Sequence, residues 1–98
     1  MKNEIKDDII EAFYMKEFSI ILDSNPTTGY SWVPLFDKNY LELRDRSIKM
    51  NSNMFGSSSK EVFKFNPIKC GITNLTMIYK RDWEENEIQK VNFEIKIH

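Results

Sequence analysis

The chain has 98 residues, of which 41% are hydrophobic and 13% aromatic, and its 14 basic residues nearly balance 15 acidic ones. A chain of this length predicts one domain, residues 1–98, with a small core and little room for a deep catalytic pocket, which argues against an enzyme. The near-neutral charge offers no basic surface for nucleic acid or for a membrane, and no run approaches the ~20 apolar residues of a membrane span.

The cysteine content and the N-terminal sequence bear on the compartment. Cys70 is the single cysteine, so the chain cannot form an internal disulfide and suits a reducing compartment. The segment Met1–Asp8 has no apolar stretch of the kind found in signal peptides. We therefore expect a cytoplasmic protein that folds without disulfides.

Alternation of apolar and polar residues predicts β-strands along most of the chain. Near the N-terminus, Ile5, Ile9 and Phe13 have helical spacing, but isoleucine and phenylalanine favour strands, so one or two strands are expected there. Later strands are expected around Phe18–Leu22, Tyr30–Pro34, Leu41–Met50, Phe63–Phe65, Leu75–Tyr79 and Val91–Ile97, the last of them antiparallel and half-buried. Turns at about 8–12-residue spacing between short strands predict an all-β antiparallel sandwich of about 7–8 strands.

The order of the connections predicts which of them share an end of the sandwich. In an antiparallel meander or Greek key, successive connections mostly alternate between the two ends. From the connection at 25–29, the chain runs out and back before 51–59, and out and back again before 81–86. These three connections are therefore expected to form a single edge, as the loops of an antibody domain do.

The first of these connections has the residues of a rigid, shaped turn. Pro26 fixes φ, and Gly29 can adopt a positive φ without penalty. Thr27 and Thr28 are stiff at χ1, and Asn25 is suited to an Asx turn. The segment is expected to be preorganised and so to lose little entropy on binding. An ordinary tight connection is the alternative interpretation.

The other two connections carry residues typical of interfaces. Met54 and Phe55 are large and apolar at a loop tip, which is costly unless they are buried or meet a partner. Arg81 and Trp83 belong to the residue types enriched among interface hot spots. In the alternative interpretation, Met54 and Phe55 cap the core, Trp83 covers the end of the sandwich and Arg81 pairs with a neighbouring carboxylate.

Four other features have a structural interpretation. Cys70 is expected in a turn at the opposite end without an activating signature, and the terminal His98 is expected to be mobile, so neither predicts catalysis. One cysteine and one histidine provide no metal-ligand spacing. The acidic run from Asp82 to Glu87 is expected to be a solvated loop that tunes the choice of partner. Trp32 is expected to be the core tryptophan of the sandwich.

The segment Asn25-Pro26-Thr27-Thr28-Gly29-Tyr30, followed by Ser31-Trp32, resembles the signature loop of the chagasin-type inhibitors of papain-like cysteine peptidases. Two further motifs of that family follow in the same order. Gly56-Ser57-Ser58-Ser59 keeps only the leading glycine of a Gly-X-Gly-Gly loop, and Arg81-Asp82-Trp83 has an aspartate in place of the proline of Arg-Pro-Trp. The resemblance extends from about Phe18 to Ile97.

The resemblance implies an immunoglobulin-like fold and reversible, tight-binding inhibition of papain-like cysteine peptidases, cathepsin L-like enzymes among them, by a monomer without cofactor or metal. It implies that Thr27 and Thr28 enter the catalytic cleft, that Met54 to Ser57 lie along the non-primed side, and that Trp83 with Arg81 packs on the primed side. The predicted peptidase-binding residues are Asn25, Pro26, Thr27, Thr28, Gly29, Tyr30, Met54, Phe55, Gly56, Ser57, Arg81, Asp82 and Trp83. A non-inhibitory immunoglobulin-like adhesion or scaffold module that uses the same loops is the alternative.

Overall fold

The alternating segments of the sequence form β-strands. A computed structural model describes residues 7–25, 28–50, 59–81 and 88–98. The described residues form seven strands, namely β1 (Asp7–Ala12), β2 (Phe18–Ser24), β3 (Tyr30–Phe36), β4 (Leu41–Met50), β5 (Ser59–Pro67), β6 (Gly71–Arg81) and β7 (Gln89–Ile97). This confirms the all-β class and assigns one strand to the described part of the N-terminal region.

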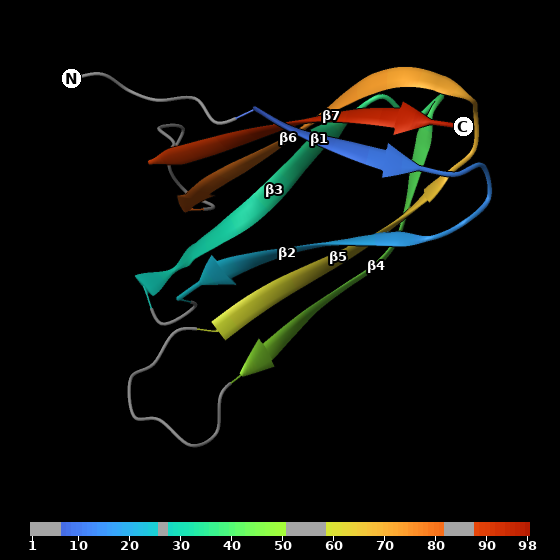
Figure 1. Cartoon of the computed structure of the whole chain (residues 1–98). Coiled ribbons are helices and arrows are strands. Elements are labelled where there is room, and N and C mark those ends of the chain that lie inside the picture. The colour runs from blue at the N-terminus through green and yellow to red at the C-terminus, as the bar shows by residue number, and fades with distance from the viewer. Residues whose placement is uncertain (1–6, 26–27, 51–58, 82–87) are drawn as a thin grey trace.

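The strands form two sheets that face each other, as the upper and lower layers in Figure 1 show. One sheet has the order β1-β7-β6-β3, and the other has the order β2-β5-β4. This two-sheet arrangement confirms the predicted immunoglobulin-like sandwich. The inward side chains of both sheets form one core, which contains Ala12, Ile20, Trp32, Leu41, Phe63, Phe65, Leu75, Met77, Tyr79, Phe93, Ile95 and Ile97.

The pairing of β1 with β7 departs from the predicted antiparallel arrangement. β7 is antiparallel to β6, as expected, but it is parallel to β1, with Asp7 opposite Asn92 and Ala12 opposite Ile97. A hairpin forces two neighbouring strands to be antiparallel. β1 instead continues into β2 of the other sheet, so its connection leaves it free to run alongside β7 in the same direction.

Trp32 is the core tryptophan that the sequence predicts. Its side chain is 2% exposed, and its ring centroid lies 4.7 Å from that of Tyr79. Its indole Nε1 donates a hydrogen bond of 2.8 Å to the carbonyl of Asp23. Because Asp23 belongs to β2 and Trp32 to β3, this one residue links the edges of the two sheets.

Candidate functional site

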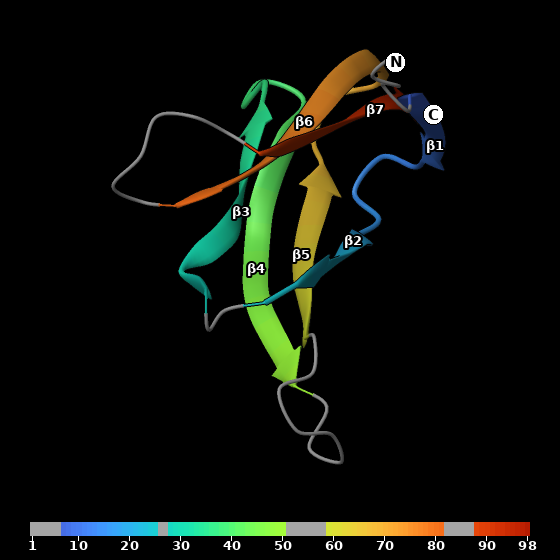
Figure 2. The ribbon, with the colours of Figure 1, turned by 90° about the vertical axis from the view of Figure 1, so that its left-hand side faces the viewer.

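Strand ends from both sheets gather at one end of the sandwich. Ser24, the last residue of β2, and Met50, the last of β4, both pair with Ser59, the first of β5. In the other sheet, Tyr30 at the start of β3 pairs with Arg81 at the end of β6. Figure 1 shows these strand ends on the left, and Figure 2 looks onto them. The strand ends that flank the three predicted connections therefore share one end, as the alternation of connections predicts.

The structure describes part of the predicted binding set. Asn25, Thr28, Gly29, Tyr30 and Arg81 are described, and all five lie at this end of the sandwich. The remaining predicted residues, Pro26, Thr27, Met54, Phe55, Gly56, Ser57, Asp82 and Trp83, lie outside the described residues.

Hydrogen bonds between Asn25 and Thr28 hold the described part of the first connection. The Asn25 carbonyl accepts a bond of 3.2 Å from the Thr28 backbone N–H and one of 2.8 Å from the Thr28 hydroxyl. The same hydroxyl oxygen accepts a bond of 3.4 Å from the backbone N–H of Tyr30. Gly29 has a φ of 85°, which L-residues with a side chain rarely adopt. The Thr28 hydroxyl thus fixes the turn from within, in addition to the χ1 stiffness that the sequence predicts.

A stack of aromatic rings supports this turn. The ring centroids of Tyr79 and Tyr30 lie 5.4 Å apart, and the Arg81 guanidinium carbon lies 4.6 Å from the centre of the Tyr30 ring. The Tyr79 hydroxyl accepts a hydrogen bond of 3.0 Å from the backbone N–H of Asn25. Trp32 also contacts the Tyr79 ring, so the stack connects the core to Asn25 and to the end of β6. The aromatic stack therefore joins Asn25 and Tyr30, beside the first connection, to Arg81, beside the third.

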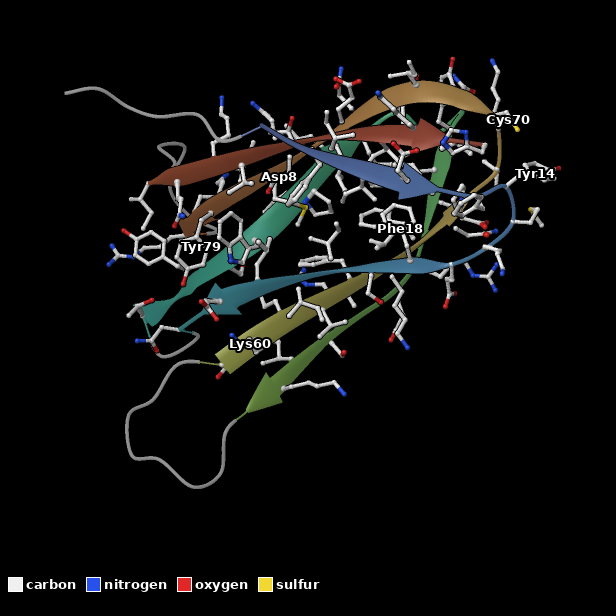
Figure 3. The ribbon with its side chains drawn as sticks, in the orientation of Figure 1. Asp8, Tyr14, Phe18, Lys60, Cys70 and Tyr79 are labelled. Atoms are coloured by element: carbon white, nitrogen blue, oxygen red, sulfur yellow. The ribbon has the colours of Figure 1, made fainter. Side chains whose placement is uncertain are left out.

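Replacing Tyr79 with phenylalanine should loosen the start of the turn. The change keeps the ring stack but removes the hydroxyl that accepts the Asn25 N–H, and we expect a loss of about 1 kcal/mol in the free energy of unfolding. Amide hydrogen exchange at Asn25 should become faster. The matched control is Tyr14→Phe, because Tyr14 is 54% exposed at the opposite end of the molecule (Figure 3). Equal exchange at Asn25 in both variants would contradict the proposed support.

Glu61 is a residue of this end that the sequence analysis missed. It is fully buried, and its Oε2 accepts a hydrogen bond of 2.7 Å from the hydroxyl of Ser24. The backbone N–H of Trp32 lies 3.4 Å from each carboxylate oxygen, and Nη2 of Arg46 lies 3.2 Å from Oε1. The sequence did contain a sign of this role. Residues two apart on a strand point to the same face, so Glu61 points to the core face of β5 together with Phe63, where a charged residue is unusual.

The opposite end of the sandwich holds the other candidate residues. Cys70 is exposed there, ahead of β6 (Figure 3). The prediction that His98 is mobile was wrong, because its N–H donates to the Ala12 carbonyl at 2.9 Å, its carbonyl accepts from the Tyr14 N–H at 2.8 Å, and its ring contacts Glu11. Glu11 and Ala12 belong to the parallel neighbour β1, and Tyr14 follows this strand in the chain. Within residues 7–25, 28–50, 59–81 and 88–98, no group of three potential ligands could hold a metal ion.

A search for membrane-spanning elements in the same described ranges found no helix long and apolar enough to cross a bilayer.

Comparisons with known proteins agree with one another. Residues 15–97 match the chagasin family of peptidase inhibitors, inhibitor family I42. The chain is 32% identical over 71 residues to amoebiasin-2 of Entamoeba histolytica, and the match covers 69% of this chain and 58% of amoebiasin-2. The matched part is thus less than two thirds of that relative's length.

Solved structures share the fold. The crystal structure of the cysteine protease inhibitor EhICP2 from Entamoeba histolytica superposes with a TM-score of 0.82 at 25% identity, covering 93% of this chain and 86% of that one. The solution structure of amebosin superposes with a TM-score of 0.59 at 23% identity, covering 92% of this chain and 88% of that one, and supports the fold alone. The family match extends over most of the chain and includes strands β2 to β7. The chain therefore belongs to the chagasin family of peptidase inhibitors, and not to a family of enzymes.

Proposed function

We propose that the chain is a reversible, tight-binding inhibitor of papain-like cysteine peptidases and that it occludes the catalytic cleft with the three connections at one end of the sandwich. The observation that carries the proposal is the gathering of the flanking strand ends around the Asn25–Thr28 turn. Membership of the chagasin family supports it. So does the shared fold of EhICP2, which is itself a cysteine protease inhibitor.

The three connections would fill the catalytic cleft of the peptidase. In this proposal Thr27 and Thr28 enter the cleft and block access to the catalytic Cys–His pair, Met54 to Ser57 lie along the non-primed side, and Trp83 packs on the primed side. Arg81 supports this placement because its guanidinium is already stacked on Tyr30, beside the first connection. The hydrogen bond from the Thr28 N–H to the Asn25 carbonyl is that of a turn and not of an extended peptide, so the first connection would present no scissile bond in a near-attack geometry.

The purified protein should inhibit papain and cathepsin L competitively and stoichiometrically and should remain uncleaved. The preorganised turn loses little entropy on binding, which favours tight association. Steady-state inhibition assays measure the effect, and mass spectrometry of the recovered protein detects cleavage. Full peptidase activity at micromolar concentrations of the folded protein would overturn the proposal and favour a non-inhibitory adhesion or scaffold module.

We further propose cathepsin L-like enzymes as targets, a monomeric state and a cytoplasmic location. The exposed Cys70, the single cysteine of the chain, supports a reducing compartment. A panel of papain-like peptidases, sedimentation velocity and cell fractionation test these three points. A stable dimer, or a protein found mainly in the medium, would contradict them.

A further inference from the structure

We propose that Glu61 is a positioning residue of the inhibitory end, where its buried carboxylate holds together the strands that enter and leave the first connection. The inference rests on the proposed inhibition of cysteine peptidases. It concerns a residue that would not touch the peptidase and would act through the shape of the binding edge.

The position of Glu61 is not explained by packing alone. It lies on β5, the central strand of the three-stranded sheet, and faces the core with none of its surface exposed. Taking a carboxylate out of water is costly, and a well-packed apolar residue at such a site is often neutral or stabilising in comparison. The charge is therefore more useful for fixing a specific arrangement than for increasing the stability of the fold.

The partners of Glu61 come from three other strands. Ser24, whose hydroxyl donates at 2.7 Å, is the last residue of β2, and Trp32, whose N–H lies 3.4 Å from both oxygens, belongs to β3. Arg46 of β4 lies 3.2 Å away, and its guanidinium also covers the Phe63 ring at 5.3 Å. The carboxylate thus joins the strands on either side of the first connection to the strand that leads to the second.

This link matters because β2 and β3 belong to different sheets. The backbone ladder of neither sheet joins β2 to β3, so the separation of the two strands that the 25–29 connection bridges must be fixed by side chains. Two such links are described. One is the Glu61 carboxylate between Ser24 and the Trp32 N–H, and the other is the Trp32 indole on the Asp23 carbonyl. Loss of the first removes one of the links at the base of the turn and leaves the Trp32–Asp23 bond and the Tyr79 hydroxyl on the Asn25 N–H in place.

A looser base should weaken inhibition. A binding edge that samples several arrangements must be ordered when it binds, and that ordering lowers affinity. Glu61→Gln keeps the shape but puts an amide NH₂ where one carboxylate oxygen accepted hydrogen bonds. The Trp32 N–H and Arg46 can only donate, and the Ser24 hydroxyl would have to turn and accept, so the variant cannot keep all the bonds of the carboxylate. We expect the variant to inhibit papain about tenfold less tightly, mainly through faster dissociation.

The test separates positioning from general stability. Ile95→Val serves as the matched control, because it removes one methylene-sized group from a fully buried residue near the opposite end. Inhibition constants and dissociation rates for papain are measured for wild type and both variants at a temperature at which all are folded. Amide exchange is measured at Thr28, whose N–H bonds to Asn25, and at Tyr14, whose N–H bonds to His98. Glu61→Gln should weaken inhibition and speed exchange at Thr28 but not at Tyr14, whereas Ile95→Val should leave inhibition unchanged.

Each outcome decides the inference. If wild type inhibits papain and Glu61→Gln inhibits it equally well, the positioning role is wrong and the inhibitory function stands. If wild type does not inhibit, the function itself fails. If Glu61→Gln does not fold, Ser24→Ala and Arg46→Met decide, since each removes one partner of the carboxylate. Weaker inhibition with faster exchange at Thr28 in these variants supports the role, and wild-type values of both overturn it.

Discussion

Trp32→Ala should lower the free energy of unfolding by about 3–5 kcal/mol, the usual cost of truncating a buried aromatic residue. The indole fills the core beside Tyr79, and its Nε1 bonds to Asp23 across the edges of the two sheets. The substitution therefore removes packing and a link between sheets together. Denaturant unfolding followed by circular dichroism measures the loss, and a variant as stable as wild type would contradict the core role of Trp32.

Trp32→Phe is the control that divides this effect into its parts. Phenylalanine keeps an aromatic ring against Tyr79 but has no N–H to donate to Asp23. We expect a clearly smaller loss of stability than for Trp32→Ala, because most of the apolar contact remains. If the two variants are equally unstable, the hydrogen bond between the sheets, and not the packing, dominates.

Trp83→Ala should weaken peptidase inhibition by about 2–4 kcal/mol, the range of an aromatic interface hot spot. In the proposed complex Trp83 buries its ring at the primed side of the cleft. The melting temperature should stay close to that of wild type, the opposite of the behaviour expected for Trp32→Ala. Inhibition constants measured beside thermal melts make the comparison.

Two outcomes would contradict the role assigned to Trp83. Inhibition equal to that of wild type would remove it from the interface. A large loss of melting temperature would make it a cap on the core, and the proposed edge would then be wrong at that position.

The strands and their inward faces were predictable because alternation is a local property of the sequence. Phe65, Leu75 and Ile95 are each flanked by polar residues, and each is fully buried. The alternation of successive connections between the two ends of the sandwich then indicated which strand ends meet. Leu43 is a partial exception, since it is 37% exposed on an edge strand next to a β-bulge between Leu43 and Asp45. A bulge depends on pairing with β5 and has no local signal there.

Features that depend on distant partners were not predictable in the same way. The order of His98 results from its backbone bonds to Ala12 and Tyr14, which exist because β1 lies parallel to β7. The role of Arg81 at Tyr30 requires the register of β3 on β6. For Glu61, the parity of its strand shows that it faces inward, but its partners come from three other strands and could only be identified in the folded chain.

The pairing of β1 with β7 has a consequence for how the chain reaches its native state. It joins the earliest described strand to the last one, so a very long loop must close before this ladder can form. Contacts of such large sequence separation are typical of slowly folding β-proteins. During synthesis, β1 leaves the ribosome long before β7 exists and has no neighbour within its own sheet until β7 is made. The four-stranded sheet is therefore completed only after β7 has been translated, and Ile9 and Ile10 of β1 have no partner strand in this sheet until then.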